Sequence, residues 1–209
     1  MVIVLGTRNR KKLEEILDHL AGVPIKWHTL ADYPTAPEIE EDGDTFLANA
    51  RKKATELARA LGAWVLGEDS GLVVDALGGR PGVYSARYSG PGATDESNNQ
   101  KLLGELAGVP EPKRTAHYVC TAVLSDPWGN VHAEVEGHCS GRIGLEPHGT
   151  HGFGYDPLFV IPEYHKTYGE LGLQVKRHLS HRARALARLR PILWSLLGSR
   201  RGNSGELNG

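Results

Sequence analysis

The sequence predicts an α/β protein, because segments with the pattern of buried strands alternate with segments of helical periodicity. Val2–Leu5 is a continuous apolar run that ends at a glycine, which is typical of a buried strand. Apolar residues at helical spacing follow it over residues 13–20. Residues 116–125 and 131–137 flank a turn of Asp, Pro, Trp, Gly and Asn, which predicts an antiparallel hairpin. The chain therefore predicts a sheet together with helices.

The next helix and strand are marked by their ends. A helix is predicted over Phe46–Leu61, since Asp44 or Thr45 can cap its first turn and a glycine ends its apolar pattern. Residues 63–66 predict a short buried strand that ends in a Gly-rich turn over residues 67–71. The remaining predicted elements are a resumed strand at 72–74, a long shaped loop at 76–92, a helix from Thr94 or Asp95 to Gly108, a Gly-rich loop at 149–157, a strand at 158–161, and a helix capped by Ser180 that Pro191 kinks or divides.

Length and composition indicate one globular domain of ordinary type. The chain has 209 residues, of which 40% are hydrophobic and 23% charged, and its net charge is -1. We expect residues 1–198 to form this domain and residues 199–209 to form a small, polar, disordered tail. A nearly neutral chain gives no electrostatic reason to expect nucleic acid as a partner, and no apolar run is long enough to cross a membrane.

The start of the chain and the two cysteines indicate in which cellular compartment the protein is expected. The first apolar run, Val2–Leu5, is too short for the hydrophobic region of a signal peptide, so we expect a cytoplasmic protein. Cys120 and Cys139 are accordingly expected to be buried, reduced thiols. Because both lie on the predicted hairpin, a disulfide between them is the alternative.

The polar segment between the first strand and the first helix has the geometry of a phosphate site. It contains Thr7, Arg8, Asn9, Arg10, Lys11 and Lys12. A turn that leads from a buried strand into a helix presents free backbone N–H groups and the positive end of the helix dipole. Thr7 and Asn9 can add hydrogen bonds, and Lys12 can reach an anion. The alternative is a solvated basic turn; a Walker loop is excluded, because its two-glycine spacing is absent.

Carboxylates at two places are candidates for a metal site. An acidic, Pro-rich loop spans residues 33–44 and includes Glu40 and Glu41, and Glu68 with Asp69 ends the short predicted strand. Magnesium binds hard oxygen ligands, usually one or two carboxylates together with water and substrate phosphate. Active-site groups of α/β folds commonly lie at strand ends. A solvated charge run is the alternative for the loop, and a simple turn residue is the alternative for Asp69.

Two further segments are suited to a flat polar ligand. Residues 152–157 are Gly-Phe-Gly-Tyr-Asp-Pro, so that the backbone can approach a ligand on which an aromatic ring stacks. Lys176, His181 and Arg182 are hydrogen-bond donors near a predicted helix start. The alternatives are an aromatic plug in a tight turn and a capped, positively charged helix end. Each pattern is weak alone, but the combination is what a nucleotide hydrolase requires.

Five blocks of the sequence match one known family in order, and they span nearly the whole chain apart from the tail. The blocks are residues 7–12 (TRNRKK); 45–50 (TFLANA) with Lys53 and Ala54; 69–72 (DSGL) through 77–88 (LGGRPGVYSARY); 152–157 (GFGYDP) with Lys166, Thr167, Glu170 and Leu171; and 180–182 (SHR). Together they resemble the non-canonical purine NTP pyrophosphatases, also called inosine triphosphate or dITP/XTP pyrophosphatases. The third block is long and specific, so chance does not explain the match.

The resemblance implies a fold, an assembly and a reaction. The expected fold is an elongated mixed α/β sheet flanked by helices, with a substrate cleft between two lobes. The expected assembly is a homodimer, and the expected cofactor is magnesium. The expected reaction is hydrolysis of ITP, dITP and XTP between the α and β phosphates, which gives the monophosphate and pyrophosphate and cleanses the nucleotide pool.

The resemblance also implies roles for residues of this chain. Asp69 is expected to be the general base that acts on water and also a metal ligand, with Glu40 or Glu41 completing the metal site and Lys53 beside them in the catalytic group. The first block is expected to hold the phosphates, and Ser70 to contact the substrate. The expected base-binding residues are Phe153, Gly154, Tyr155 and Asp156, which orient the base, and Lys176, His181 and Arg182, which bind its 6-oxo edge.

The sequence departs from the family pattern at a few positions, and two other functions are considered as alternatives. Glu68 stands where the family usually has aspartate, which leaves its metal role open, and Tyr168 with Gly169 replaces a commoner small pair. One rival is a related enzyme acting on modified pyrimidine or methylated nucleotides, against which His181 and its neighbouring arginine argue. The other is a nucleotide-sensing or RNA-binding module without catalysis, against which Asp69 and the net charge argue.

Overall fold

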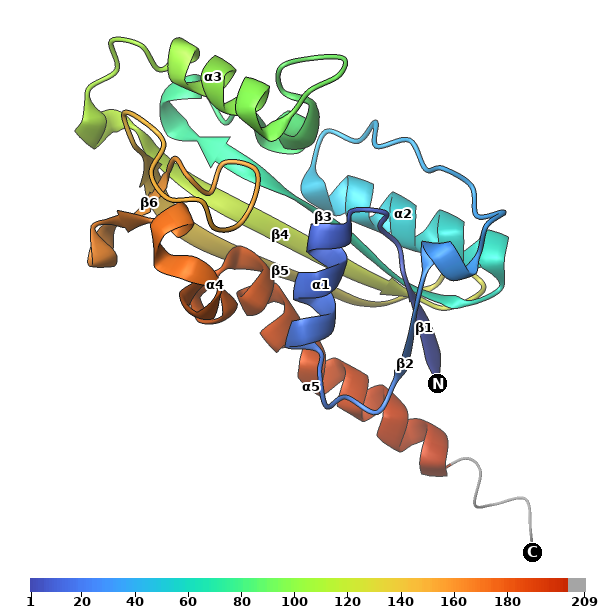
Figure 1. Cartoon of the computed structure of the whole chain (residues 1–209). Helices are drawn as coiled ribbons and strands as arrows, with labels where there is room; N and C mark the ends of the chain where they lie inside the picture. Colours follow the sequence, from blue (N-terminus) through green and yellow to red (C-terminus); the bar gives the residue numbers. More distant parts are fainter. Residues whose placement is uncertain (203–209) are drawn as a thin grey trace, which may run out of the picture.

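The computed structural model describes residues 1–202 and is built around one seven-stranded mixed sheet (Figure 1). The strands, in spatial order, are β2 (Lys26–Thr29), β1 (Val2–Leu5), β3 (Trp64–Val74), β4 (Thr115–Ser125), β5 (Val131–Ile143), β6 (Phe159–Ile161) and β7 (Lys166–Thr167). β1 is parallel to both of its neighbours, and the pairs from β3 to β7 are antiparallel. The predicted mixed α/β fold is confirmed.

Helices cover both faces of this sheet (Figure 1). The α-helices are α1 (Arg10–His19), α2 (Phe46–Leu61), α3 (Asp95–Glu105), α4 (Tyr168–Leu179) and α5 (His181–Gly202). Strand alternation decides which helix meets which side chain. Val65 and Val123 point to the face covered by α2, whereas their neighbours Leu66 and Leu124 point to the face covered by α1 and α5.

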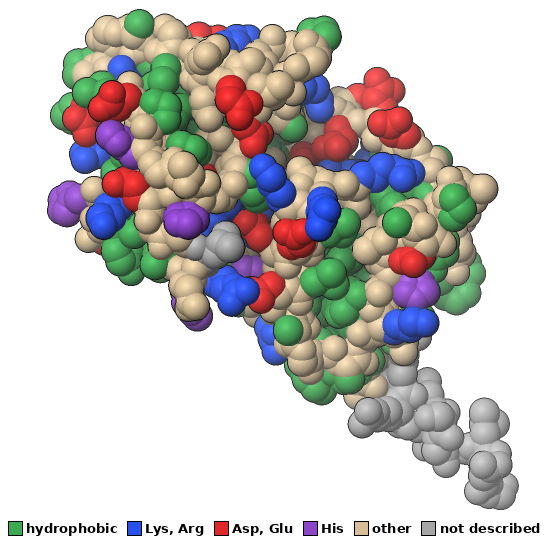
Figure 2. Space-filling view, in the orientation of Figure 1, with side chains coloured by type: hydrophobic (Ala, Val, Ile, Leu, Met, Phe, Trp, Pro, Cys, Tyr) green, Lys and Arg blue, Asp and Glu red, His purple; other side chains and the backbone are tan. Residues whose placement is uncertain are grey.

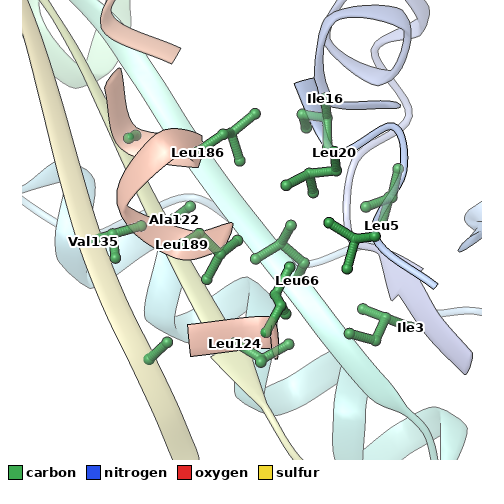
Figure 3. Close-up of a cluster of buried hydrophobic side chains, with 14 of the residues drawn as sticks. Ile3, Leu5, Ile16, Leu20, Leu66, Ala122, Leu124, Val135, Leu186 and Leu189 are labelled. Atoms are coloured by element: carbon green, nitrogen blue, oxygen red, sulfur yellow. The ribbon is translucent and has the colours of Figure 1, made fainter. Parts of the chain in front are cut away.

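The first hydrophobic core lies between the sheet and the helices α1 and α5 (Figure 3). Ile3, Leu66 and Leu124 from the strands meet Leu20 after α1 and Leu189 of α5. None of these side chains is more than 2% exposed. Full burial of a leucine or isoleucine contributes about 1.5–3 kcal/mol, so this core holds α1 and α5 firmly against the sheet.

A second core lies at the other end of the long strands. Leu72 and Val74 of β3 pack there with Leu102 of α3, Phe159 of β6 and Tyr168 of α4. β3, β4 and β5 pass through both cores, which gives the molecule its elongated shape (Figure 1). The same three long strands therefore carry two separate hydrophobic cores.

β1 is much shorter than β3, and this leaves one edge of β3 free for other elements. β1 pairs with β3 only at residues 64–66 of β3. After Leu5 the chain turns at Gly6, whose N–H donates to the carbonyl of Leu66, and enters α1. The start of α1 therefore lies beside the continuing edge of β3, which is where the predicted carboxylates are.

The Gly-rich turn predicted after residue 66 is wrong, because β3 continues there without a break. Its glycines serve close packing instead of a turn. A side chain on Gly67 would collide with the backbone of Ala50 in α2, and one on Gly71 would collide with the 3₁₀ helix Gly82–Arg87. The two carboxylates between these glycines consequently lie inside a strand, with their side chains on opposite faces of the sheet.

We expect Gly67→Ala to lower the free energy of unfolding by about 1–3 kcal/mol, because a Cβ there meets rigid backbone rather than a flexible side chain. Gly104→Ala is the matched control, since a Cβ at this position of α3 meets nothing within 4 Å. The control should be neutral or stabilising. Urea unfolding of both variants checks this, and equal stability of the two would contradict the packing argument.

Four other features differ from the sequence prediction. β2 and α4 were not predicted, because β2 is a short strand with little apolar pattern and α4 contains a non-helical Gly172. Pro191 does not divide α5, because Leu189 and Leu193 on either side are both buried against the sheet. Part of the expected tail, up to Gly202, continues α5, and residues 203–209 lie outside the described residues.

Both cysteines are free and buried, as expected. Cys120 on β4 lies opposite Gly137, and Cys139 on β5 lies opposite Tyr118, so the thiols are offset along the hairpin. The disulfide alternative is therefore wrong for this structure. Within residues 1–202, no helix combines the length and the apolar character needed to cross a membrane.

Candidate active site

A cavity of about 420 Å³ opens where the start of α1 meets the free edge of β3. Lysine, arginine, aspartate and glutamate side chains gather around the hollow on the face drawn in Figure 2. The predicted site residues that line it are Thr7, Arg8, Asn9, Lys12, Glu41, Lys53, Asp69, Ser70, Phe153, Gly154, Tyr155, Asp156, Lys176, His181 and Arg182. The fold thus brings residues of all five sequence blocks together.

The start of α1 forms one end of the cavity. Asn9 is the N-cap and accepts the Lys12 N–H at 3.2 Å, while Thr7 Oγ1 accepts the Asn9 N–H at 3.2 Å. The other N–H groups of this first turn have no partner within the helix. Burial alone would lower the pKa of Lys12, but Glu68 and Asp69 raise it, so Lys12 stays charged. These groups can bind an anion.

Two residues of the first block do not line the cavity. The Arg10 side chain is 91% exposed and pairs with Glu14 one turn later. Lys11 pairs with Asp95 of α3 at 3.5 Å, and its Nζ lies 5.4 Å from the centre of the Phe153 ring. Successive residues of a helix point about 100° apart, so only part of a continuous polar run can face one ligand.

Asp69 is the central carboxylate of the cavity and is held by α2. The amide of Asn49 donates to Asp69 Oδ2 at 3.1 Å. Lys53 Nζ lies 3.6 Å from Asp69 Oδ1 and 2.9 Å from Glu41 Oε2. Asn49 and Lys53 are four residues apart, so they share one face of α2. That face is pressed against β3 because Gly67 lets the helix backbone approach.

The two carboxylates beside Lys53 differ in proton affinity. Burial raises the pKa of Asp69 to about 6, against the opposing effect of Lys53 and Lys12. Burial acts in the same direction on Glu41, but Lys53 outweighs it and lowers the pKa of Glu41. Asp69 is thus the group suited to accept a proton near neutral pH.

Glu41 and Asp69 match the number of protein carboxylates that usually bind magnesium. Glu41 lines the cavity and shares Lys53 with Asp69, whereas Glu40 is exposed and does not line the cavity. Within the described part of the chain, no group of three or more His, Cys, Asp or Glu side chains is arranged for a metal. One or two carboxylates are what magnesium uses when substrate phosphate and water complete its shell. Glu41 and Asp69 are therefore the residues that could hold it.

Glu68 is placed away from this pair, on the face of β3 that meets α1 and α5. It is 1% exposed, and its two oxygens lie 2.9 Å from Lys12 Nζ and 2.9 Å from Arg182 Nη2. Cys120 Sγ donates to the same carboxylate at 3.3 Å. Burial would raise the pKa of Glu68, but Lys12 and Arg182 hold it well below its ordinary value. Glu68 thus forms ion pairs with Lys12 and Arg182 and does not lie beside Glu41, where a metal ligand would be needed.

Asp156 organises the opposite end of the cavity. It is 2% exposed and accepts from Lys176 Nζ at 2.6 Å and from the Phe153 N–H at 2.9 Å. Lys176 Nζ in turn lies 4.4 Å from the centre of the Phe153 ring. Burial raises the pKa of Asp156, and Lys176 opposes this shift. The Gly-rich loop and α4 are held together at this point by one carboxylate.

His181 and Arg182 lie at the start of α5, between the two ends. Burial lowers the pKa of His181 far below its ordinary value, and Arg182 and Lys176 add to this, so the imidazole is neutral. Its Nδ1 is buried without a hydrogen-bond partner. Arg182 is 1% exposed and donates to Glu68 at 2.9 Å, to Ser70 Oγ at 3.0 Å and to Glu15. Arg182 is consequently rigid.

Several residues of the site were missed by sequence reasoning. Asn49 belongs to a matched block, and a polar residue on the apolar face of α2, four before Lys53, was a usable signal. Arg87 of the third matched block donates to the carbonyl of Glu41 at 2.8 Å and holds the acidic loop, a contact between distant segments that no local pattern indicates. Tyr118 lines the cavity from β4, where its strand pattern is that of an ordinary core aromatic.

Comparison with known proteins decides the family. The model of the Ham1 family matches residues 3–192. The chain belongs to the Ham1 family. A dITP/XTP pyrophosphatase of Rhodopirellula baltica is 57% identical over 94% of this chain and 95% of its own length. Another dITP/XTP pyrophosphatase, from Geobacter sulfurreducens, is 52% identical over 91% of this chain and 96% of its own length.

Solved Ham1 structures share the fold as well as the sequence. A HAM1 protein from Coxiella burnetii superimposes with a TM-score of 0.86 at 38% identity, covering 93% of this chain and 99% of that one. The Ham1 match ends inside α5, at residue 192, so it includes every residue that lines the cavity. The cavity is thus a feature of the part of the chain that is shared with the family.

Proposed function

We propose that this protein hydrolyses the non-canonical purine nucleotides ITP, dITP and XTP to the monophosphate and pyrophosphate, and so cleanses the nucleotide pool. One observation carries the proposal: the same cavity is lined by the start of α1, which is suited to an anion, by a buried carboxylate of raised pKa, and by the aromatic and polar side chains around Asp156. The dITP/XTP pyrophosphatases named among its relatives support the substrate class.

Asp69 is the proposed general base. It accepts the proton of the attacking water, while Asn49 and Lys53 hold its carboxylate in place. Glu41 and Asp69 are the proposed ligands of magnesium. When bound, magnesium offsets the charge of the phosphates and polarises the α-phosphorus. Lys53 bridges the two carboxylates and is positioned to meet a phosphate that enters between them.

The phosphates are proposed to lie against the start of α1. Thr7, Arg8 and Asn9 offer backbone and side-chain donors there, and Lys12 adds a fixed positive charge. Such donors stabilise the leaving pyrophosphate, because they are already aligned when negative charge develops on it. Arg10 and Lys11 of the same block can contribute only at the rim, since neither lines the cavity.

The base is proposed to occupy the end of the cavity around Asp156. Phe153, Gly154 and Tyr155 pack on it, and Ser70 contacts the substrate beside Arg182. Lys176, His181 and Arg182 are the proposed group that binds the 6-oxo edge. Adenine carries an amino group at that edge, which would leave buried donors unpaired, and mismatches of this kind discriminate strongly.

Assembly, domain limits and location are further parts of the proposal. We propose that residues 1–198 form one domain, which the continuous seven-stranded sheet supports. A homodimer is proposed from the family resemblance. Two buried free thiols suit the reducing cytoplasm, where a nucleotide-pool enzyme acts.

Pyrophosphate release from ITP, XTP, dITP, GTP and ATP tests the function. We expect metal-dependent release from ITP and XTP, with little from ATP and GTP. The kcat/KM for ITP should exceed that for ATP at least about 100-fold, because the amino group of adenine leaves the buried donors unpaired. A chelator in excess should abolish release. Release from modified pyrimidine or methylated nucleotides instead would overturn the substrate but keep the mechanism. No release from any nucleotide, together with salt-dependent RNA affinity, would favour a binding module.

A further inference from the structure

Tyr118 contacts both Asp156 and His181, two of the proposed base-binding residues. It lies on β4, is 7% exposed and lines the cavity. Its ring stacks on His181, with the ring centres 4.7 Å apart and the planes at 11°. Its hydroxyl donates to Asp156 Oδ1 at 3.3 Å. β4 belongs to the rigid sheet, whereas Asp156 belongs to a loop and His181 to a helix start.

Two aromatic neighbours in the second core hold the ring of Tyr118 in place. Phe159 packs against it with ring centres 4.6 Å apart and planes at 52°, and Tyr168 lies 6.3 Å away. Parallel stacking leaves a neutral imidazole free only to turn within its own plane. The orientation of the His181 plane is therefore set by a side chain anchored in the second core, and its unpartnered Nδ1 is held in a defined direction.

The hydroxyl of Tyr118 acts on Lys176 through Asp156, which contacts both. Asp156 receives three donors, which come from Tyr118, Lys176 and the Phe153 backbone. A carboxylate held by three donors has little freedom to rotate, so the ammonium of Lys176 is held with it. Tyr118 thus contacts His181 directly and acts on Lys176 through Asp156, while Glu15 holds Lys176 from another side at 3.0 Å.

We propose that Tyr118 is a positioning residue that sets base selectivity, by aligning His181 through its ring and Lys176 through its hydroxyl. The inference rests on the proposed function, since it assumes that these two residues bind the base. Donors discriminate between bases only if they are fixed before the base arrives, because mobile donors turn towards solvent or towards either base. Loss of Tyr118 therefore costs the preferred base much more than the rejected one.

Two variants separate the ring from the hydroxyl. Tyr118→Leu removes both, and we expect the ratio of kcat/KM for ITP over ATP to fall about 100-fold, mainly through a higher KM for ITP. Tyr118→Phe keeps the stack and loses only the hydrogen bond, so the same ratio should fall about fivefold. A merely structural defect would lower turnover of ITP and ATP together and leave the ratio unchanged.

Tyr168→Phe is the matched control. Tyr168 is 1% exposed, belongs to the same aromatic cluster and loses a comparable hydrogen bond, to Cys139 Sγ at 2.9 Å, but it does not line the cavity. We expect its ITP to ATP ratio to equal that of the wild type. If Tyr118→Leu does not fold, the comparison of Tyr118→Phe with Tyr168→Phe decides, and equal ratios in these two overturn the proposal.

The wild-type protein assayed alongside separates this inference from the proposed function. Absence of ITP and XTP turnover in the wild type overturns the function and the inference with it. Wild-type selectivity that persists in Tyr118→Leu overturns the inference alone. A fall of the ratio in both Tyr118 variants, with Tyr168→Phe unchanged, supports it.

Discussion

Replacing Asp69 with asparagine is expected to lower kcat for ITP by about 10²–10⁴-fold, because the amide keeps the shape of the side chain but cannot take a proton from water. The fold should survive the change. Asp69 is 4% exposed, and the amide oxygen of asparagine can still accept from Asn49. Steady-state pyrophosphate release at saturating magnesium measures the effect.

Asp75→Asn is the matched control for this variant. Asp75 follows directly after β3, accepts from Thr115 Oγ1 at 2.6 Å and does not line the cavity. The same chemical change there should leave kcat unchanged. Normal turnover in Asp69→Asn would show that another group activates the water.

The pH dependence of kcat/KM tests the proposal that Asp69 is the general base. Burial raises the pKa of Asp69 to about 6, and a general base must be ionised, so activity should rise with pH through this region and level off above it. A bound divalent cation favours the ionised form, so the rise should move to lower pH as magnesium concentration increases. A rise that is insensitive to magnesium would argue against contact between Asp69 and the metal.

Replacing Glu68 with alanine is expected to lower the free energy of unfolding by about 3–5 kcal/mol, because it leaves buried cations without their carboxylate. Glu68 and Arg182 are each 1% exposed, and the Lys12 side chain is 16% exposed. Arg182 keeps Glu15, but Lys12 loses its ion-pair partner. Urea unfolding measures the loss, and Glu68→Asp, which retains a carboxylate, should lose less.

Glu14→Ala is the control for a lost ion pair without burial. Glu14 pairs with Arg10 on the exposed face of α1, so its removal should change stability by no more than about 0.5 kcal/mol. Equal losses for the two variants would contradict the role of burial at Glu68.

The stabilising effect of Glu68 should also depend on pH. Its pKa in the folded protein is held well below the ordinary value of 4.5, so its contribution is fully present above that value. The contribution is lost as pH falls from 4.5 towards the lower folded value. The stability difference between wild type and Glu68→Ala should therefore shrink in acid and stay constant at neutral pH.

Sequence reasoning succeeded where the structural signal is local. The start of α2 could be predicted because Thr45 caps it, and its end because Gly62 adopts a left-handed conformation. It failed at residues 67–71, where glycines that normally indicate turns lie inside β3. Their cause is the close approach of α2, which is a tertiary contact that no local pattern contains.

For the site, the sequence predicted the participants better than their geometry. Blocks far apart in the chain do line one cavity, but the acidic loop alone could not distinguish Glu41 from Glu40. A loop has no periodicity from which the direction of a side chain follows. Tyr118 was missed for a different reason, since a tyrosine in a buried strand looks the same whether it fills a core or supports a binding group.

Glu68 and Asp69 lie on opposite faces of β3, so the register of this strand decides which of the two carboxylates lines the cavity. A slip of β3 by one residue would exchange a carboxylate that balances buried cations with one that lines the cavity. Gly67 opposes such a slip, because any other residue brought beneath Ala50 would drive its side chain into the backbone of α2. Mutations that loosen the α2–β3 contact should therefore misdirect charge before they unfold the protein, and activity should fail earlier than stability.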